Sequence, residues 1–401
     1  MLTKDVISII FSIIIIPILA LAQGWQPQIS PRTDRNLFDI WFVSESIGCA
    51  CGNFGFLIQT TDAGTNWQDR SGVTNSWIDD MCFANSWIGY AVGEAGTIIK
   101  TIDAGENWQL INSGTNRNLY GISFPDTNIG WVTGQGGIIR HTTDAGNTWS
   151  DQISGLTLFI FDIEFVNPDT GWACGQNGWV YKTSSGGDTW LRSHVSGSDL
   201  HGLKCVSGNE LWVVGSGGRI YHITEFGNNV QNWQPGSSVL KAVEIKGSKI
   251  WVCGQYGIIW HSSNNGDTWV QQASQTTNYL DEIFFWDENQ GWTIGMQGTI
   301  RYTENGGIGL NECLTGFVDK SIDIRPNPAQ DQLKISFNCR PTFSKARIIF
   351  WAINGKRLKQ LDLPVNGSTV ELKTTGLPSG IYFVEINLDY HKTLNKLMIT
   401  N

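Results

Sequence analysis

Two adjoining stretches decide the fold, namely GWVTGQGGII at residues 130–139 and TTDAGNTW at residues 142–149. Related stretches recur along the chain at a nearly constant spacing. The second glycine of the first stretch returns at steps of 41, 41, 41, 40, 39 and 41 residues, as Gly52, Gly93, Gly134, Gly175, Gly215, Gly254 and Gly295. Self-similarity at such a period is typical of repeat architectures. The sequence therefore predicts seven copies of one structural unit.

Each copy has the pattern of four short antiparallel strands. In the first copy, the alternating residues 37–42 predict the innermost strand, and the segment that ends at Gly52 predicts the second. A Gly-x-Ile-Ile type segment predicts the third strand, and a tight turn leads into the fourth. Four strands in roughly 40 residues are typical of a propeller blade. We therefore expect an all-β chain with a seven-bladed β-propeller over residues 23–307.

The turn before the fourth strand has the sequence Asp-x-Gly-x-x-Trp, the Asp-box. Its aspartate is suited to accept backbone N–H groups, its glycine to take a positive φ, and its tryptophan to pack between blades. Because the motif follows the repeat, we predict a structural role for its residues. They are Asp62, Gly64, Trp67, Asp103, Gly105, Trp108, Asp144, Gly146 and Trp149. In later copies Ser185 and Asn264 replace the aspartate.

The two ends of the repeat predict how the ring closes. The seventh copy stops after Gly307 and lacks its tryptophan strand, whereas residues 24–26 resemble residues 66–68 of the first copy. We expect the N-terminal segment around Trp25 to supply the outer strand of the last blade. Such a strand would remove an open sheet edge.

Residues 1–22 are predicted to be a signal peptide. Lys4 precedes an apolar run over residues 9–21, and Ala20-Leu21-Ala22 offers a cleavage site before Gln23. A membrane anchor is the alternative, although Ser12 and Pro17 interrupt the run. No later segment is expected to span a membrane.

After a linker predicted over residues 308–321, the pattern changes. Alternating runs at residues 333–337, 346–350, 370–372 and 381–386 predict short strands separated by turns. Residues 322–401 are therefore expected to form a small Ig-like β-sandwich.

Composition excludes some functions. The formal net charge is -9, and no basic cluster lies among the aromatic residues, so nucleic acid is not expected as a partner. Cys51, Cys174 and Cys253 share one repeat position and are expected to be small buried residues. A disulfide between Cys313 and Cys339 is an open alternative. The spacing of His and Cys predicts no metal site, and no cofactor motif is present.

One column of the repeat suggests a ligand site. Aligning the inner strands brings together four acids, namely Asp39, Asp80, Asp162 and Glu282. Around a channel mouth they would attract a cation or a basic peptide. The alternative is ordinary solvated carboxylates at turn edges. Trp77, just before an inner strand, is expected either to contact a protein or glycan ligand on one propeller face or to pack.

No catalytic constellation is found. A sialidase would need an arginine cluster with a tyrosine and a glutamate, whereas Arg140, Arg219 and Arg301 fall near one strand position and are interpreted as solvated charges. His141, His222 and His261 also lie on third strands. We expect them to satisfy hydrogen bonds at strand edges.

The C-terminal region resembles the type IX secretion C-terminal sorting domain of Bacteroidetes. The resemblance rests on residues 326–329 (PNPA), 354–356 (NGK), 376–384 (GLPSGIYFV) and 396–399 (KLMI). It implies export through the type IX machinery, with residues 322–401 as the contact, and a protein that is secreted or attached to the outer cell surface.

The propeller resembles the photosystem II stability/assembly factor family of Asp-box propellers. Its Gly-Trp-x-x-Gly-x-x-Gly and Asp-x-Gly-x-Asn/Thr-Trp units carry the resemblance, which implies a protein-binding platform without naming the partner. Two functions are left open. One is a secreted, non-enzymatic binding or scaffold propeller, and the other is a secreted carbohydrate-active enzyme.

Overall fold

The computed structural model describes residues 24–152, 155, 157–225 and 229–308, followed by 322–325, 332–337, 345–352, 357–364, 369–374, 377–388 and 391–399. It divides into two compact units, residues 1–309 and 310–401. The predicted signal peptide, nearly all of the predicted linker and both Cys313 and Cys339 lie outside the described residues. Across these ranges, no helix is long and apolar enough to cross a membrane.

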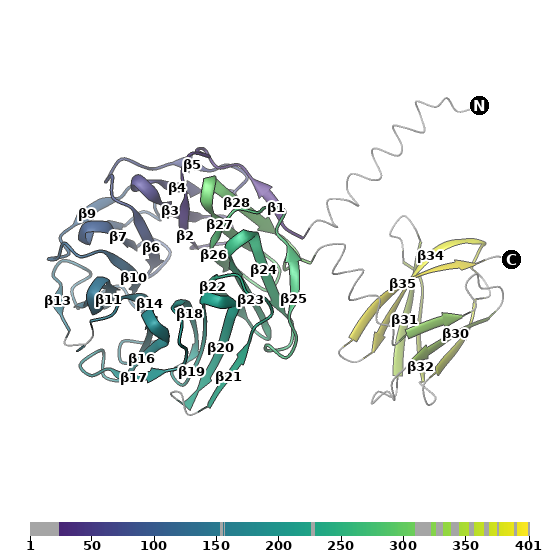
Figure 1. The fold of residues 1–401 in the computed structure, drawn as a ribbon. Coiled ribbons are helices and arrows are strands. Elements are labelled where there is room, and N and C mark those ends of the chain that lie inside the picture. Colours follow the sequence, from purple (N-terminus) through teal and green to yellow (C-terminus); the bar gives the residue numbers. More distant parts are fainter. Residues whose placement is uncertain are drawn as a thin grey trace, which may run out of the picture. The chain divides into compact units, whose positions relative to one another are not determined.

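The first unit is a ring of seven four-stranded antiparallel sheets, as predicted (Figure 1). The innermost strands are β2 (Leu37–Phe42), β6 (Ile78–Phe83), β10 (Leu119–Ser123), β14 (Ile160–Phe165), β18 (Leu200–Ser207), β22 (Leu240–Lys246) and β26 (Leu280–Phe285). The second strands are β3 (Gly48–Gly52), β7 (Gly89–Gly93), β11 (Gly130–Gly134), β15 (Gly171–Gly175), β19 (Glu210–Gly215), β23 (Lys249–Gly254) and β27 (Gly291–Gly295).

Two further strands complete each blade. The third strands are β4 (Leu57–Thr60), β8 (Ile98–Thr101), β12 (Ile139–Thr142), β16 (Trp179–Thr183), β20 (Arg219–Thr224), β24 (Ile258–Ser262) and β28 (Thr299–Thr303). The outer strands are β5 (Gln68–Asp69), β9 (Gln109–Ile111), β13 (Ser150–Asp151), β17 (Leu191–His194), β21 (Asn229–Trp233), β25 (Val270–Ala273) and, in the seventh blade, β1 (Gln26–Gln28).

The second glycine of the repeat is required by a close approach of two backbones. A Cβ atom at Gly52 would lie 1.8 Å from the carbonyl oxygen of Asn36, and one at Gly134 would lie 2.1 Å from that of Asn118. The same carbonyls accept N–H groups from the 3-10 turns that follow, over 2.9 Å for Gln135 and Asn118. A side chain at this position would therefore separate the inner strand from the turn.

The core lies between neighbouring blades. The second-strand aromatic of one blade stacks on a phenylalanine at the end of the next blade's inner strand or just after it, with ring centroids 3.5 Å apart for Trp131 and Phe165 and 3.8 Å apart for Tyr90 and Phe124. The ring of Phe124 also fills the space where a Cβ of Gly130 would lie. Each blade thus buries its apolar surface only against its neighbours, which explains why the repeat preserves both residue types.

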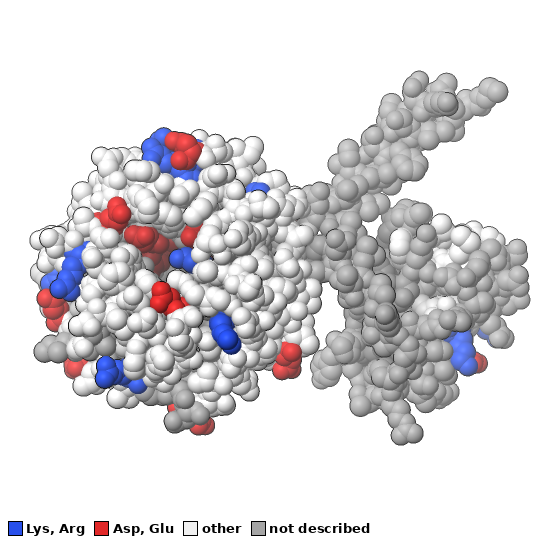
Figure 2. Space-filling view, in the orientation of Figure 1, with Lys and Arg blue, Asp and Glu red and all other residues white. Residues whose placement is uncertain are grey.

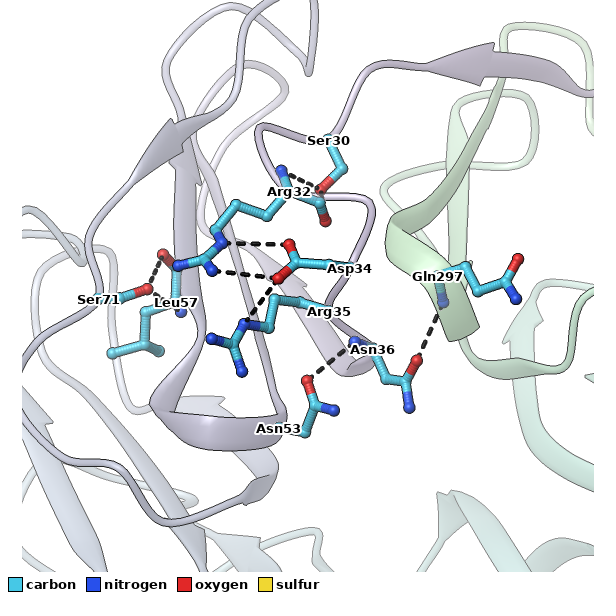
Figure 3. Close-up of polar contacts among 9 residues, drawn as sticks. All are labelled: Ser30, Arg32, Asp34, Arg35, Asn36, Asn53, Leu57, Ser71 and Gln297. Atoms are coloured by element: carbon cyan, nitrogen blue, oxygen red, sulfur yellow. Dashed lines mark hydrogen bonds and ion pairs between the residues drawn. The ribbon is translucent and has the colours of Figure 1, made fainter.

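The N-terminal segment closes the ring, as predicted. Strand β1 pairs antiparallel with β28, with Gln26 opposite Tyr302. Trp25 is fully buried, and its indole N–H donates to Gln272 Oε1 over 2.9 Å. The seam has a polar part as well (Figure 3), because Asn36 Oδ1 accepts the backbone N–H of Gln297 over 3.0 Å.

The Asp-box aspartate accepts a hydrogen bond from a threonine hydroxyl that the sequence analysis did not include. Asp62 Oδ1 accepts the backbone N–H of Asn66 over 2.8 Å, as expected, and also the hydroxyl of Thr60 over 2.9 Å. The Thr60 hydroxyl oxygen in turn accepts the N–H of Gly64. Gly64 has φ 83°, and the preceding Ala63 is also positive at 56°. The threonine at the end of the third strand therefore belongs to the motif.

The Asp-boxes at Asp103–Trp108 and Asp144–Trp149 repeat this arrangement. Asp103 Oδ1 accepts the N–H of Asn107 and Asp144 Oδ1 that of Thr148, each over 2.9 Å. Gly105 and Gly146 have φ values of 88° and 81°. The substituted copies keep the turn as well, since Ser185 Oγ and Asn264 Oδ1 accept the equivalent N–H groups over 3.1 and 3.0 Å.

The second unit is a β-sandwich. Its three-stranded sheet has the order β29 (Ile322–Arg325), β30 (Gln332–Phe337), β33 (Thr369–Lys373). Its four-stranded sheet has the order β32 (Arg357–Pro364), β31 (Lys345–Ala352), β34 (Gly380–Leu388), β35 (His391–Ile399). Side chains of both sheets share one buried cluster, which includes Ile335 and Val370 from the first and Phe350 and Val384 from the second.

The cysteines of the propeller behave as predicted. Cys51, Cys174 and Cys253 are buried free thiols. Burial raises the pKa of the neighbouring thiol of Cys49 to about 12. These side chains are therefore neutral packing groups at neutral pH.

Candidate functional site: the central channel

A β-bulge near the start of every inner strand shapes the channel. The pairing with the second strand shifts between Leu37 and Asp39 in the first blade, and the shift recurs in all seven blades. A bulge turns two successive side chains towards the same side. As a result, Asp79 and Asp80 both line the channel, although a regular strand would point them in opposite directions.

The inner strands carry three rings of side chains. The upper ring consists of Phe38, Asp79, Tyr120, Phe161, His201, Lys241 and Asp281, the middle ring of Asp39, Asp80, Gly121, Asp162, Gly202, Ala242 and Glu282, and the lower ring of Trp41, Cys82, Ser123, Glu164, Lys204, Glu244 and Phe284. The upper ring lines a cavity of about 480 Å³, the upper cavity, and the lower ring lines one of about 290 Å³, the lower cavity.

The four predicted acids stand between the two cavities. Asp39, Asp80, Asp162 and Glu282 line both of them. Figure 2 shows acidic side chains gathered in the hollow at the centre of the ring, while other charges are scattered over its surface. The repeat therefore placed these acids in one layer of the channel.

The interpretation of these acids as solvated turn-edge carboxylates is wrong. Asp39 is buried, with an exposed fraction of 6%, and none of the other three is exposed. Three of the four accept a backbone N–H group from the inner strand of the next blade, over 2.6 Å from Met81 to Asp39 and 2.7 Å from Ile122 to Asp80. Asp162 accepts the N–H of Leu203 over 2.8 Å. These three carboxylates join one blade to the next, whereas Glu282 accepts the N–H of Ile283 in its own strand.

Burial and mutual repulsion raise the pKa values of these acids, which favours their uncharged forms. Burial is the main cause that raises the pKa of Asp39 and of Asp80, and for Asp80 the charges of Asp39 and Asp162 raise it further. Burial raises the pKa of Asp162 to about 7, against the hydrogen bond from Leu203. It also raises that of Glu282. Part of the middle ring is therefore protonated at neutral pH.

The lower cavity contains its own cation. The ammonium of Lys204 lies 3.6 Å from Glu164 and 3.5 Å from Glu244. Burial opposes the charge of Lys204, but the charges of Glu164, Glu244 and Glu282 together raise its pKa above the usual value. Glu164 also accepts the N–H of Cys205 over 2.7 Å. The acids of the lower ring are therefore paired within the chain.

The upper cavity contains two acids that the sequence analysis missed. Burial raises the pKa of Asp79 and of Asp281 to about 7, with the charge of Glu94 adding to the first and that of Lys241 opposing both. Atom Oδ2 of each is buried and has no hydrogen-bond partner among the residues that the structure describes. A signal was available, because Asp79-Asp80 and Asp281-Glu282 are adjacent acid pairs in equivalent copies.

Aromatic side chains form the other part of the upper cavity wall. Trp77 lines it with an exposed fraction of 39%, and its ring packs 5.6 Å from that of Phe38. Tyr120 lies 6.0 Å from each of Phe159 and Phe161. Trp77 therefore both packs and faces the cavity, and the two expectations for it do not exclude each other.

Two of the three third-strand histidines do not make the strand-edge hydrogen bonds that the sequence predicted. His141 and His261 stack on Trp131 and Trp251 at 4.6 and 5.0 Å, and their Nε2 atoms are buried without a hydrogen-bond partner in the described part of the chain. Only His222 makes the expected type of contact, to Glu210 over 2.9 Å.

Arg140 is not a solvated strand charge. Its exposed fraction is 8%, and its guanidinium donates to the carbonyls of Ser113 and Trp149 and pairs with Asp151. Of the arginines that the structure describes, none lines either channel cavity. In the same ranges, no group of three or more His, Cys, Asp or Glu side chains is arranged to hold a metal ion.

Two family profiles match the chain. The secretion system C-terminal sorting domain matches residues 323–400, and the photosynthesis system II assembly factor YCF48 matches residues 72–155 and 151–237. The C-terminal unit is thus a sorting domain that addresses the protein to the type IX machinery, for export to the cell surface or the extracellular space. A search of curated proteins found no match.

Several solved structures share the fold. A structure described as YCF48 bound to D1 peptide is 20% identical over 71% of this chain and 98% of that chain, with a TM-score of 0.61. YCF48 from Cyanidioschyzon merolae is 17% identical over 70% and 98%, with a TM-score of 0.59. The extracellular domain of a putative one-component system from B. thetaiotaomicron is 14% identical over 94% and 59%, with a TM-score of 0.58. At these identities the likeness establishes the propeller architecture.

Proposed function

We propose that this exported propeller is a non-enzymatic binding or scaffold protein that holds its ligand on the face where the inner strands begin. The upper cavity opens there, and the exposed ring of Trp77 lies beside it. Pockets that combine apolar walls with a few convergent polar groups are the usual form of a ligand site.

The observation that carries this proposal is the use of the middle-ring carboxylates. A glycosidase needs one carboxyl to protonate the leaving group and another to act on the opposite side of the sugar. Here Asp39 accepts the N–H groups of Ile40 and Met81, and Asp162 those of Ile163 and Leu203. Carboxylates that bond the blades together are poorly placed to exchange protons with a substrate.

A screen for turnover tests the proposal. The purified protein, with Asp80→Asn and Glu282→Gln variants, is incubated with aryl-glycosides and polysaccharides, and released chromophore or reducing ends are measured. We expect no turnover above that of heat-denatured protein. Turnover that is lost in either variant would refute the non-enzymatic assignment, because both side chains line the channel.

A secreted carbohydrate-active enzyme is the second candidate, favoured by one observation. Asp79 and Asp281 combine pKa values of about 7 with an aromatic-lined cavity, and a general acid needs a pKa near the working pH. If this candidate holds, Asp79→Asn or Asp281→Asn removes turnover while Asp80→Asn preserves part of it. Equal inactivity of all forms supports the binding role.

A further inference from the structure

We propose that the upper cavity binds an arginine side chain presented by a peptide segment of a partner protein. This inference rests on the proposed binding role and names the chemistry of its ligand. The cavity has three features that suit such a ligand, namely an excess of acids, two carboxyls without an ion pair and an aromatic wall.

The charge of the upper cavity is strongly unbalanced. Six acids line it against a single lysine, Lys241. His201 does not add a charge, because burial lowers its pKa to about 4. Part of these acids is protonated at neutral pH, and a cation that enters the cavity favours their ionised forms and is attracted by them.

Two carboxyls in this cavity lack the partners that the other acids have. The ion pairs of the described residues include none to Asp79 or Asp281, although the lower cavity pairs Lys204 with two glutamates. Both side chains line the cavity, so a cationic side chain that enters it would supply the counter-charge that these carboxyls lack. The carboxyls stand on blades two and seven, either side of the first blade.

The aromatic wall selects a planar cation. Guanidinium is flat, weakly hydrated and able both to stack on aromatic rings and to donate to carboxylates, whereas ammonium is a compact and strongly hydrated charge. The same face already contains one such contact, since the guanidinium of Arg35 lies 4.8 Å over the ring of Phe54. Phe54 in turn packs 6.2 Å from Trp77.

A peptide fits these features better than a glycan. Aromatic rings serve both ligands, but a neutral sugar offers only hydroxyl groups and cannot compensate buried carboxylate charge. The volume of about 480 Å³ accommodates a side chain and not a folded domain. The ligand therefore inserts a side chain while its backbone stays at the mouth.

The test compares two labelled peptides that differ only in charge. Fluorescence anisotropy in physiological salt measures binding of the full chain to a Gly-Arg repeat peptide and to the same peptide with citrulline, the neutral isostere of arginine. We expect the arginine peptide to bind at least about tenfold more tightly. The variants Asp79→Asn with Asp281→Asn, and Trp77→Ala, should each weaken it by about tenfold or more.

Two matched controls separate the cavity from the general negative charge of the protein. Glu106→Gln removes an exposed acid in an outer turn, and Trp87→Ala removes a tryptophan that is 64% exposed and lines neither cavity. Both should leave the affinity unchanged. Thermal melts show whether each variant is folded, and only folded variants are compared.

Three results of the binding experiments would overturn the inference. They are equal affinity for the arginine and citrulline peptides, equal loss in the controls and the cavity variants, and preferential binding of a neutral oligosaccharide that the cavity variants abolish. A partner captured from the cell envelope whose binding ignores the cavity variants also overturns it, yet preserves the proposed function. Turnover of a substrate would instead refute the proposed function itself.

Discussion

The upper and lower cavities of the channel are built from the same seven strands, yet the charges of their buried acids are compensated in different ways. In the lower cavity, Lys204 stands between Glu164 and Glu244 at 3.6 and 3.5 Å. In the upper cavity, Asp79 and Asp281 have no ion pair among the described residues, and burial raises their pKa values to about 7. A propeller can thus accommodate channel acids with an internal counter-ion or with protonation. Only the second arrangement is open to an external cation.

Removing the internal counter-ion should have the largest effect. Lys204→Met leaves Glu164 and Glu244 close together without compensation, and breaking a buried pair in this way costs about 3 kcal/mol or more. We expect the melting temperature to fall by roughly 10 °C. Lys241→Met in the upper cavity is the matched change and should shift it by far less. Similar shifts in the two variants would mean that the cavities do not differ in this respect.

Removing the unpartnered acids should have a smaller effect of the opposite sign that depends on pH. An acid whose folded pKa lies above its unfolded value binds more protons when folded, so its contribution to stability falls as pH rises from roughly 4 to 7. The double variant Asp79→Asn with Asp281→Asn lacks both carboxyls, so it does not lose this stability as pH rises. Relative to the unmodified protein, the double variant should gain stability between pH 4.5 and pH 8, by about 5 °C in melting temperature.

The difference in melting temperature between the double variant and the unmodified protein reports the titration of Asp79 and Asp281 alone. Burial lowers the pKa values of His201 and His261 to about 4. The unfolded chain therefore binds more protons at these histidines, so their contribution to stability rises with pH. Both proteins contain these histidines, and the contribution cancels in the difference. A difference in melting temperature that stays constant from pH 4.5 to pH 8 would show that Asp79 and Asp281 titrate normally.

An outer turn should give the smallest effect and leave the channel unchanged. Asp103→Ala removes the acceptor for Asn107 N–H and for the Thr101 hydroxyl, at a cost of about 1–2 kcal/mol. Peptide affinity should not change, because Asp103 lines neither cavity. Weaker peptide binding at unchanged melting temperature would place the Asp-box in the ligand site.

The sequence was sufficient for the architecture because the repeat records it directly. The spacing of the second glycine gave the seven blades, and the likeness of Trp25 to Trp67 gave the closing strand. These signals are strong because backbone contact at Gly52 and burial of Trp25 tolerate few other residues.

The candidate site was only partly predictable. The column of Asp39 and its equivalents located the channel, but burial of these acids depends on how seven strands converge. Asp79 and Asp281 were missed because strict alternation points them away from the channel and no residue type marks the bulge that redirects them, although the adjacent acid pairs offered a signal. Arg140 and His141 were misinterpreted because their partners lie on other strands or in other turns, and no local pattern records such contacts.

The closing strand has a consequence for the order of events during export. Trp25 bonds to a residue 247 positions later in the chain, and Asn36 to one 261 positions later. The seam cannot form until almost the whole propeller sequence has emerged, whereas each inner hairpin can pair as soon as it appears. Contacts of such long separation form late. The ring therefore stays open while the propeller sequence is still emerging. Its last sheet is completed only after the end of that sequence has emerged.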